Sequence, residues 1–218
     1  FEHAETKVLL TDRECSPQIK VALSKVKRDI LVIDIDDPET DSGEYLGMLE
    51  YEAFLSEGDP EFEAVLPEDD WQAVSLNYTS GTTGIPKGVV YHTRGAYLLA
   101  TGNVLAWEMP HRPVYLWTLP MFHCNGWCFP WTITMLGGTH VCLRKVTAKN
   151  IYNSIAEHHV THFCGAPIVM NMISNAPKEE QRELPHRVEI MTAAAPPPPT
   201  VIAQMEEAGF NVTHVYGL

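Results

Sequence analysis

One short segment of the chain combines backbone freedom with groups that bind anions. Residues 78–88 read YTSGTTGIPKG and hold three glycines, four serine or threonine hydroxyls and one lysine. Glycines let a backbone approach a ligand closely, and consecutive amides in such a turn can form a nest for an anion. The hydroxyls and the Lys87 ammonium add further donors and a full positive charge. This composition predicts a loop that binds a polyphosphate.

Two other interpretations of the loop explain less of it. The nucleotide-binding pattern GxxxxGK[ST] needs glycine before its lysine and a hydroxyl after it, whereas this chain has Pro86 and Gly88 there. A simple hairpin turn explains the glycines, but it explains neither Lys87 nor the four hydroxyls. The polyphosphate interpretation accounts for all of these residues.

The elements that must position this loop alternate along the chain. Several apolar segments are nearly continuous, as in strands covered on both faces. The alternation predicts an α/β fold with mostly parallel sheets flanked by helices in αβα layers. The loop would follow strand 73–78, at a sheet edge before a further strand or a helix. Strands are predicted at 7–11, 30–34, 73–78, 114–119, 139–143, 161–164, 188–192 and 211–215, and helices at 17–27, 45–57, 93–107, 126–136, 148–158, 167–174 and 199–208.

The acidic composition excludes some classes of partner. The formal net charge is −13, and 16 of the 28 acidic residues lie between Asp29 and Asp70. An acidic surface repels nucleic acid, so a general DNA or RNA binder is not expected. No apolar run is long enough to span a bilayer.

The cysteines indicate a reducing compartment. Five cysteines are scattered without paired CxxC spacing, which favours free thiols in a cytoplasmic protein. Cys124 and Cys128 are spaced as metal ligands could be, although packing in an aromatic-rich segment is the simpler interpretation.

The loop sequence resembles the phosphate-loop pattern [ST]SG[ST]TGxPKG of the adenylate-forming superfamily, which includes acyl-CoA synthetases, luciferases and peptide-synthetase adenylation domains. The match is complete. The resemblance implies that the loop holds the β- and γ-phosphates of ATP and that Lys87 is catalytic. It implies ATP contacts from Thr79, Ser80, Gly81, Thr82, Thr83, Gly84 and Lys87, with Thr79 also near Mg²⁺.

A second segment of the family pattern follows in order. LPMFHCNGW, residues 119–127, resembles the segment whose aromatic or histidine side chain borders the acyl and adenylate sites. His123 is the residue expected there, with a catalytic and a substrate-binding role. No carboxylate follows Phe122 to pair with a substrate ammonium, so the acid should lack an α-amino group. Trp127 would line an apolar acid site or, equally, pack in the core.

Later segments complete the resemblance. Gly165, Ala166 and Pro167 correspond to a segment that lines the acyl pocket. Arg144 and Lys145 follow a strand where some family members contact the phosphates of CoA, although a solvated basic pair is an equal alternative. TAAAPPPPT at 192–200 and VYGL at 215–218 resemble adenine-binding segments. The adenine contacts implied are Ala194, Ala195, Pro196, Tyr216 and Gly217.

The resemblance implies an acyl-CoA synthetase that forms acyl-AMP from a carboxylic acid and ATP and then transfers the acyl group to CoA. Residues 1–218 are expected to be part of an N-terminal AMP-binding domain, with the phosphate loop at 78–88, without the C-terminal subdomain and inactive alone. Transfer to a carrier protein, a luciferase-like oxidation and a non-catalytic nucleotide-binding module remain alternatives. A homodimer is possible.

Overall fold

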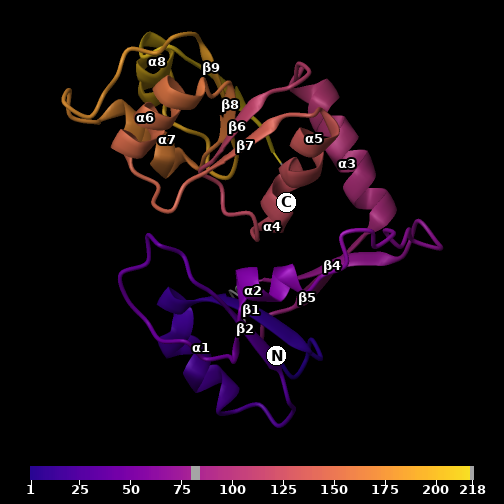
Figure 1. Ribbon diagram of the computed structural model, residues 1–218. Coiled ribbons are helices and arrows are strands. Elements are labelled where there is room, and N and C mark those ends of the chain that lie inside the picture. Colours follow the sequence, from indigo (N-terminus) through magenta and orange to yellow (C-terminus); the bar gives the residue numbers. More distant parts are fainter. Residues whose placement is uncertain (80–83, 217–218) are drawn as a thin grey trace. The chain divides into compact units, whose positions relative to one another are not determined.

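Parallel strands form in both of the units into which the chain divides, Phe1–Leu66 and Pro67–Leu218. The computed structural model describes residues 1–79 and 84–216 (Figure 1). The α/β class predicted from the sequence is confirmed.

The first unit is built on a three-stranded parallel sheet in the order β1-β2-β3. The Asp34 side chain in this sheet is only 1% exposed, and its carboxylate accepts the N–H groups of Leu46 and Gly47. These hydrogen bonds fix the segment that leads into β3. The elements are β1 (Val8–Asp12), the 3-10 helix η1 (Arg13–Cys15), α1 (Ser16–Leu23), β2 (Leu31–Ile35), β3 (Leu49–Glu50) and α2 (Tyr51–Ser56).

The helix predicted at 45–57 is shorter in the structure. Leu49 and Glu50 pair with β2 as a strand, and the Glu50 side chain then accepts the N–H of Ala53 as the N-cap of α2. The helix can therefore begin only at Tyr51.

The second unit begins with an antiparallel hairpin that leads into a long helix. β4 (Ala73–Tyr78) pairs with β5 (Gly88–His92), and α3 (Thr93–Ala106) follows at once. The loop of 78–88 therefore lies between two strands, one of the two arrangements that its sequence allows.

A five-stranded parallel sheet forms the rest of this unit, in the order β10-β9-β8-β6-β7. Its strands are β6 (Val114–Trp117), β7 (Thr139–Cys142), β8 (His162–Cys164), β9 (Val188–Thr192) and β10 (Phe210–His214). Its helices are α4 (Cys124–Trp127), α5 (Phe129–Met135), α6 (Ala148–His158), α7 (Pro167–Ser174) and α8 (Pro199–Glu207).

Helices cover both faces of the five-stranded sheet (Figure 1). Because side chains alternate between the faces of a strand, Leu116 packs with Phe163 under α6, α7 and α8, while Tyr115 and Trp117 pack with Phe129 of α5 on the other face. These two cores produce the predicted αβα layers and hold the carboxyl ends of the strands in fixed order.

His162 makes the stability of this sheet depend on pH. Its side chain is 4% exposed and lies edge-on to Trp107 at 5.0 Å between ring centroids. Burial lowers its pKa from 6.5 to about 4. The neutral ring is therefore favoured on folding, and the stability that this contributes is present above pH 6.5 and lost as pH falls towards 4.

Between pH 7 and pH 4.5, we expect His162→Gln to lose about 2 to 3 kcal/mol less of its free energy of unfolding than the parent does. Urea unfolding of both proteins at the two pH values measures this difference. Protonation of the carboxylates occurs in both proteins and cancels in the comparison. An equal loss of stability between these pH values in parent and variant would contradict the assignment.

Candidate functional site

The hairpin closes the base of the predicted phosphate loop by two hydrogen bonds. The Thr79 N–H donates to the Lys87 carbonyl at 3.0 Å, and the Lys87 N–H donates to Thr79 Oγ1 at 3.1 Å. The Lys87 side chain is exposed. The structure does not describe four predicted ATP contacts, Ser80, Gly81, Thr82 and Thr83. Only the two ends of the loop are therefore described. These ends hold Lys87 where β5 begins.

The other predicted site segments of this unit follow the carboxyl ends of neighbouring parallel strands. His123 comes after β6, Gly165 after β8, Ala194 after β9 and Tyr216 after β10. The carboxyl ends of adjacent parallel strands lie at one edge of a sheet, which is where α/β proteins bind ligands. The structure therefore brings these segments to a common edge.

Arg144 and Lys145 follow β7, which borders the sheet on the side away from β10. Four strand spacings separate β7 from β10, or about 19 Å at the usual spacing. A ligand at Arg144 and a base at Tyr216 would occupy opposite ends of the same edge. Tyr216 is fully exposed, and Gly217 lies outside the described residues.

The segments after β8 and β9 change direction as their strands end. The Gly165 N–H donates to the Met191 carbonyl at 2.9 Å, Ala166 is the N-cap of α7, and Pro167 begins that helix. Ala194 has a φ of +76°, the left-handed region that favours glycine. The segment containing Ala194, Ala195 and Pro196 thus turns sharply as β9 ends.

The segment after β6 is a left-handed turn, and this corrects the helix predicted from residue 126. Five successive residues, Cys124 to Cys128, have φ between +44° and +63°, and α5 begins only at Phe129. Most L-residues in this conformation cost roughly 1–2 kcal/mol each; Gly126 escapes that cost, and Asn125 bears less of it than the other three residues. The helix could not start earlier because the turn has the opposite hand. His123, exposed, immediately precedes it.

Contacts from α3 and β6 hold this turn in place. Asn103 of α3 donates from Nδ2 to the Trp127 carbonyl at 2.9 Å and to Thr132 Oγ1 at 3.2 Å. Trp117 lies against Gly126, where an added Cβ would stand 2.8 Å from its ring. The Trp117 indole is itself fixed, since its Nε1–H donates to His140 Nδ1 at 2.9 Å. Backbone strain that several surrounding contacts hold in place is typical of functional sites.

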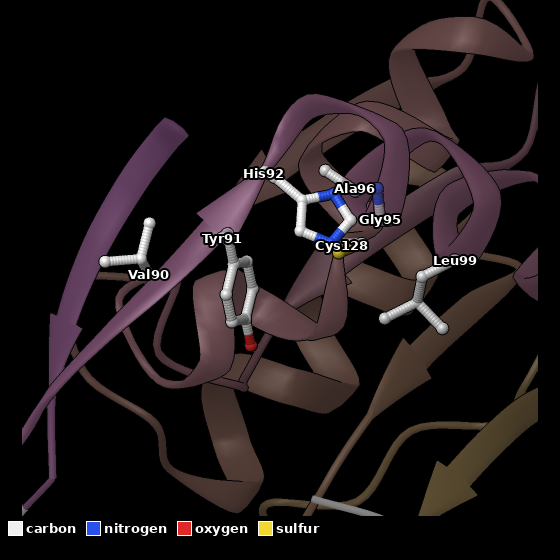
Figure 2. A pocket seen from close by; sticks show the side chains of 7 residues that line it. All are labelled: Val90, Tyr91, His92, Gly95, Ala96, Leu99 and Cys128. Atoms are coloured by element: carbon white, nitrogen blue, oxygen red, sulfur yellow. Dashed lines mark hydrogen bonds between the residues drawn. The ribbon is translucent and has the colours of Figure 1, made fainter. Parts of the chain in front are cut away.

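A small pocket of about 240 Å³ opens beside the turn (Figure 2). Among the described residues, no Asp, Glu, Lys or Arg lines it. Burial and the neighbouring Cys124 raise the pKa of the Cys128 thiol to about 11, so this wall is uncharged at neutral pH. The pocket suits a small apolar group. Its lining residues are Val90, Tyr91, His92, Gly95, Ala96, Leu99 and Cys128.

His92 has a structural task in this pocket that sequence patterns did not reveal. Its Nδ1 accepts the Gly95 N–H at 2.9 Å and caps the first turn of α3. A Cβ at Gly95 would lie 2.9 Å from His92 Cε1, so the imidazole fits here because residue 95 has no side chain. A histidine N-cap is outside the usual Ser, Thr, Asp and Asn set, which is why it was missed.

With this geometry established, comparison with known proteins decides the family. A profile of AMP-binding enzymes matches residues 1–218. The chain belongs to the AMP-binding enzyme family. Across its whole length it is 49% identical to the peroxisomal acetate/butyrate–CoA ligase AAE7 of Arabidopsis thaliana, of which it covers 41%. Over 99% of its length it is 48% identical to the acetate–CoA ligase CCL3 of Humulus lupulus, of which it covers 40%.

Two solved structures have the same fold. The N-terminal domain of FACL13 from Mycobacterium tuberculosis superposes with a TM-score of 0.76 at 21% identity, covering 98% of this chain and 63% of that one. O-succinylbenzoate CoA synthetase from Bacillus subtilis gives a TM-score of 0.74 at 23% identity, covering 100% of this chain and 40% of that one. At these identities the likeness supports the fold alone.

Proposed function

We propose that the protein containing this chain is an AMP-forming acyl-CoA synthetase. The chain spans about two fifths of the length of the curated relatives it matches, so the activity is proposed for the whole protein. The observation that supports it most is the convergence of the His123, Gly165, Ala194 and Tyr216 segments at one sheet edge. The names of the relatives, acid–CoA ligases, agree with it.

In the proposed first step, the carboxylate of the acid attacks the α-phosphate of ATP, forming the acyl–phosphate bond as the bond to pyrophosphate breaks. Lys87, fixed at the loop base, would stabilise charge on the phosphates, and His123 would border the acid and the adenylate. Tyr216 would stack on adenine, with Ala194, Ala195 and Pro196 beneath it. Catalysis then rests on positioning and charge, without a covalent enzyme intermediate.

The described residues offer Mg²⁺ few protein ligands. None of them form a group of three His, Cys, Asp or Glu side chains suited to a metal. Thr79 Oγ1 accepts one hydrogen bond from Lys87 and retains a lone pair, so it fits as an oxygen ligand beside the substrate phosphates. Mg²⁺ held there would neutralise phosphate charge.

In the second proposed step, the CoA sulfur attacks the acyl carbonyl carbon and AMP leaves. Arg144 and Lys145 at the β7 end of the edge would contact the CoA phosphates. This arrangement leaves the adenine of ATP and the phosphates of CoA well separated.

The pocket beside the turn supports a small apolar acid as substrate. Its volume, about 240 Å³, lies below the range of about 300–1,000 Å³ usual for drug-sized ligands, and no described charged side chain lines it. A substrate ammonium would find no partner there. Three relatives are named for short acids: acetate/butyrate, acetate and 2-methylpropanoate. Trp127 and Pro167, which do not line this pocket, remain predicted contacts of the acid.

The test is a panel of acids with the full-length protein, measuring ATP–pyrophosphate exchange before CoA is added. We expect acetate, butyrate and 2-methylpropanoate to exceed decanoate and glycine by at least about tenfold, since the pocket is small and offers no carboxylate. Adding CoA or a phosphopantetheinyl carrier protein then identifies the acceptor. No exchange with any acid would favour a non-catalytic nucleotide-binding module.

No helix among the described residues is long and apolar enough to cross a membrane. From the free cysteines we propose a cytoplasmic location, although two relatives are named as peroxisomal. A homodimer likewise stays a prediction.

A further inference from the structure

The left-handed turn contacts the hairpin that holds the phosphate loop. Asn125 Nδ2 donates to Ser75 Oγ of β4, 50 residues earlier in the chain. Asn125 has a φ of +44°, a conformation that asparagine adopts more readily than most residues. The side chain of Asn125 thus serves the turn and joins it to the hairpin.

A second contact lies directly across the hairpin. Ser75 and Tyr91 are cross-strand partners, so their side chains lie on the same face. Burial, followed by the nearby thiols of Cys124 and Cys128, raises the pKa of Tyr91. The cross-strand pair therefore interacts with the turn through both of its members: Ser75 with Asn125, and Tyr91 with Cys124. We call this set, Ser75, Tyr91, Cys124 and Asn125, the turn–hairpin junction.

The junction lies between two parts of the proposed site. Thr79, at the loop base, is four residues along β4 from Ser75, or about 13 Å. His123 is two residues before Asn125, and its carbonyl accepts the Gly126 N–H at 2.9 Å within the same turn. The hydrogen bond between Ser75 and Asn125 therefore links Lys87 to His123. Strand β4 and the loop base lie on the Lys87 side of this bond, and the tight turn lies on the His123 side.

We propose that Asn125 and Ser75 are positioning residues, which set the place of His123 and the bound acid relative to the phosphate loop. The proposal rests on the acyl-CoA synthetase function above. Loss of the hydrogen bond would leave ATP binding at the loop intact, but it would misplace the carboxylate for attack on the α-phosphate. Small misplacements of this kind slow a reaction without weakening binding.

The test uses the full-length protein with its preferred acid and compares Ser75→Ala, Asn125→Gly and the double variant. Glycine removes the side chain while keeping the left-handed φ available, so the contact is lost without added strain. We expect kcat for pyrophosphate exchange to fall about 10- to 100-fold in all three, with KM for ATP within about twofold of the parent. The double variant should be no worse than either single one, because both remove the same bond.

Asn125→Asp supplies the rescue. Aspartate also tolerates the left-handed region, and its carboxylate can accept a hydrogen bond from the Ser75 hydroxyl, so most of the rate should be retained. Asn211→Ala is the matched control, since it removes an exposed asparagine that donates to Glu189 across β10 and β9. It should keep the parent rate.

Three results would each overturn the proposal: additive losses in the double variant, a rise in KM for ATP as large as the fall in kcat, or an unchanged kcat in Ser75→Ala and Asn125→Gly. The synthetase function would still stand in these cases, because the parent protein is active. A parent that gives no exchange with any acid would overturn both.

Discussion

Replacing Lys87 with alanine in the full-length protein should slow acid-dependent ATP–pyrophosphate exchange by about two orders of magnitude. Loss of one preorganised charge-stabilising group costs on the order of 3 kcal/mol in the transition state. Lys87 meets this description because the N–H and Oγ1 of Thr79 at the loop base fix its main chain, while its side chain is exposed.

Two further variants show whether the position or the mere charge matters. Lys178→Ala removes another exposed lysine and should keep the parent rate. Lys87→Arg keeps a charge but replaces a compact ammonium with a planar guanidinium, so we expect an intermediate rate. Exchange at the parent rate in Lys87→Ala would contradict the assignment of the phosphate loop.

Gly126→Ala should lower the free energy of unfolding by about 2 to 5 kcal/mol, measured by urea titration. Part of the loss is the left-handed φ of +55°, which costs an alanine about 1–2 kcal/mol. The rest is overpacking, about 1–3 kcal/mol, because the new Cβ would stand 2.8 Å from Cζ3 of Trp117 and 3.0 Å from Cη2.

Gly137→Ala separates these two causes. Gly137 has a similar φ of +64°, but no atom lies within 4 Å of an added Cβ. It should lose only the conformational part, about 1–2 kcal/mol. Equal losses at the two positions would show that Trp117 does not brace the turn.

Much of the fold follows from patterns visible in the sequence. The segments predicted as strands at 188–192 and 161–164 became adjacent parallel strands, as the alternation of strands and helices along the chain indicates. The helices at 148–158 and 167–174 were predicted with the observed bounds, since Thr147 caps one and Pro167 begins the other.

The turn after β6 shows what periodicity misses. A helix was predicted at 126–136, but hydrophobic spacing carries no information on handedness. The dipeptide Asn125–Gly126, typical of turns with positive φ, was the available signal. The stability of five left-handed residues depends on Asn103, Trp117 and Ser75, which are distant in sequence and are brought near only by tertiary packing.

The site could be predicted as a set of segments but not as a geometry. The order of the motifs predicts Lys87, His123 and Tyr216 as site residues, because each belongs to a pattern that is local in sequence. The small pocket was not predicted, since Leu99 of α3 and Cys128 have no local pattern in common. The residues proposed for ATP, acid and CoA await the variants described above.

The all-parallel sheet has a consequence for how the second unit folds. Parallel neighbours cannot be joined by a short turn, and β6 pairs with β8, so Val114 and Thr161, 47 residues apart, must meet before the centre of the sheet exists. The loss of chain entropy precedes the gain from strand pairing, which makes such topologies slow to fold. Newly synthesised chains should therefore expose the apolar strands β8 and β9 for longer than a helical protein of this size would, and depend more on low concentration or chaperones to avoid aggregation.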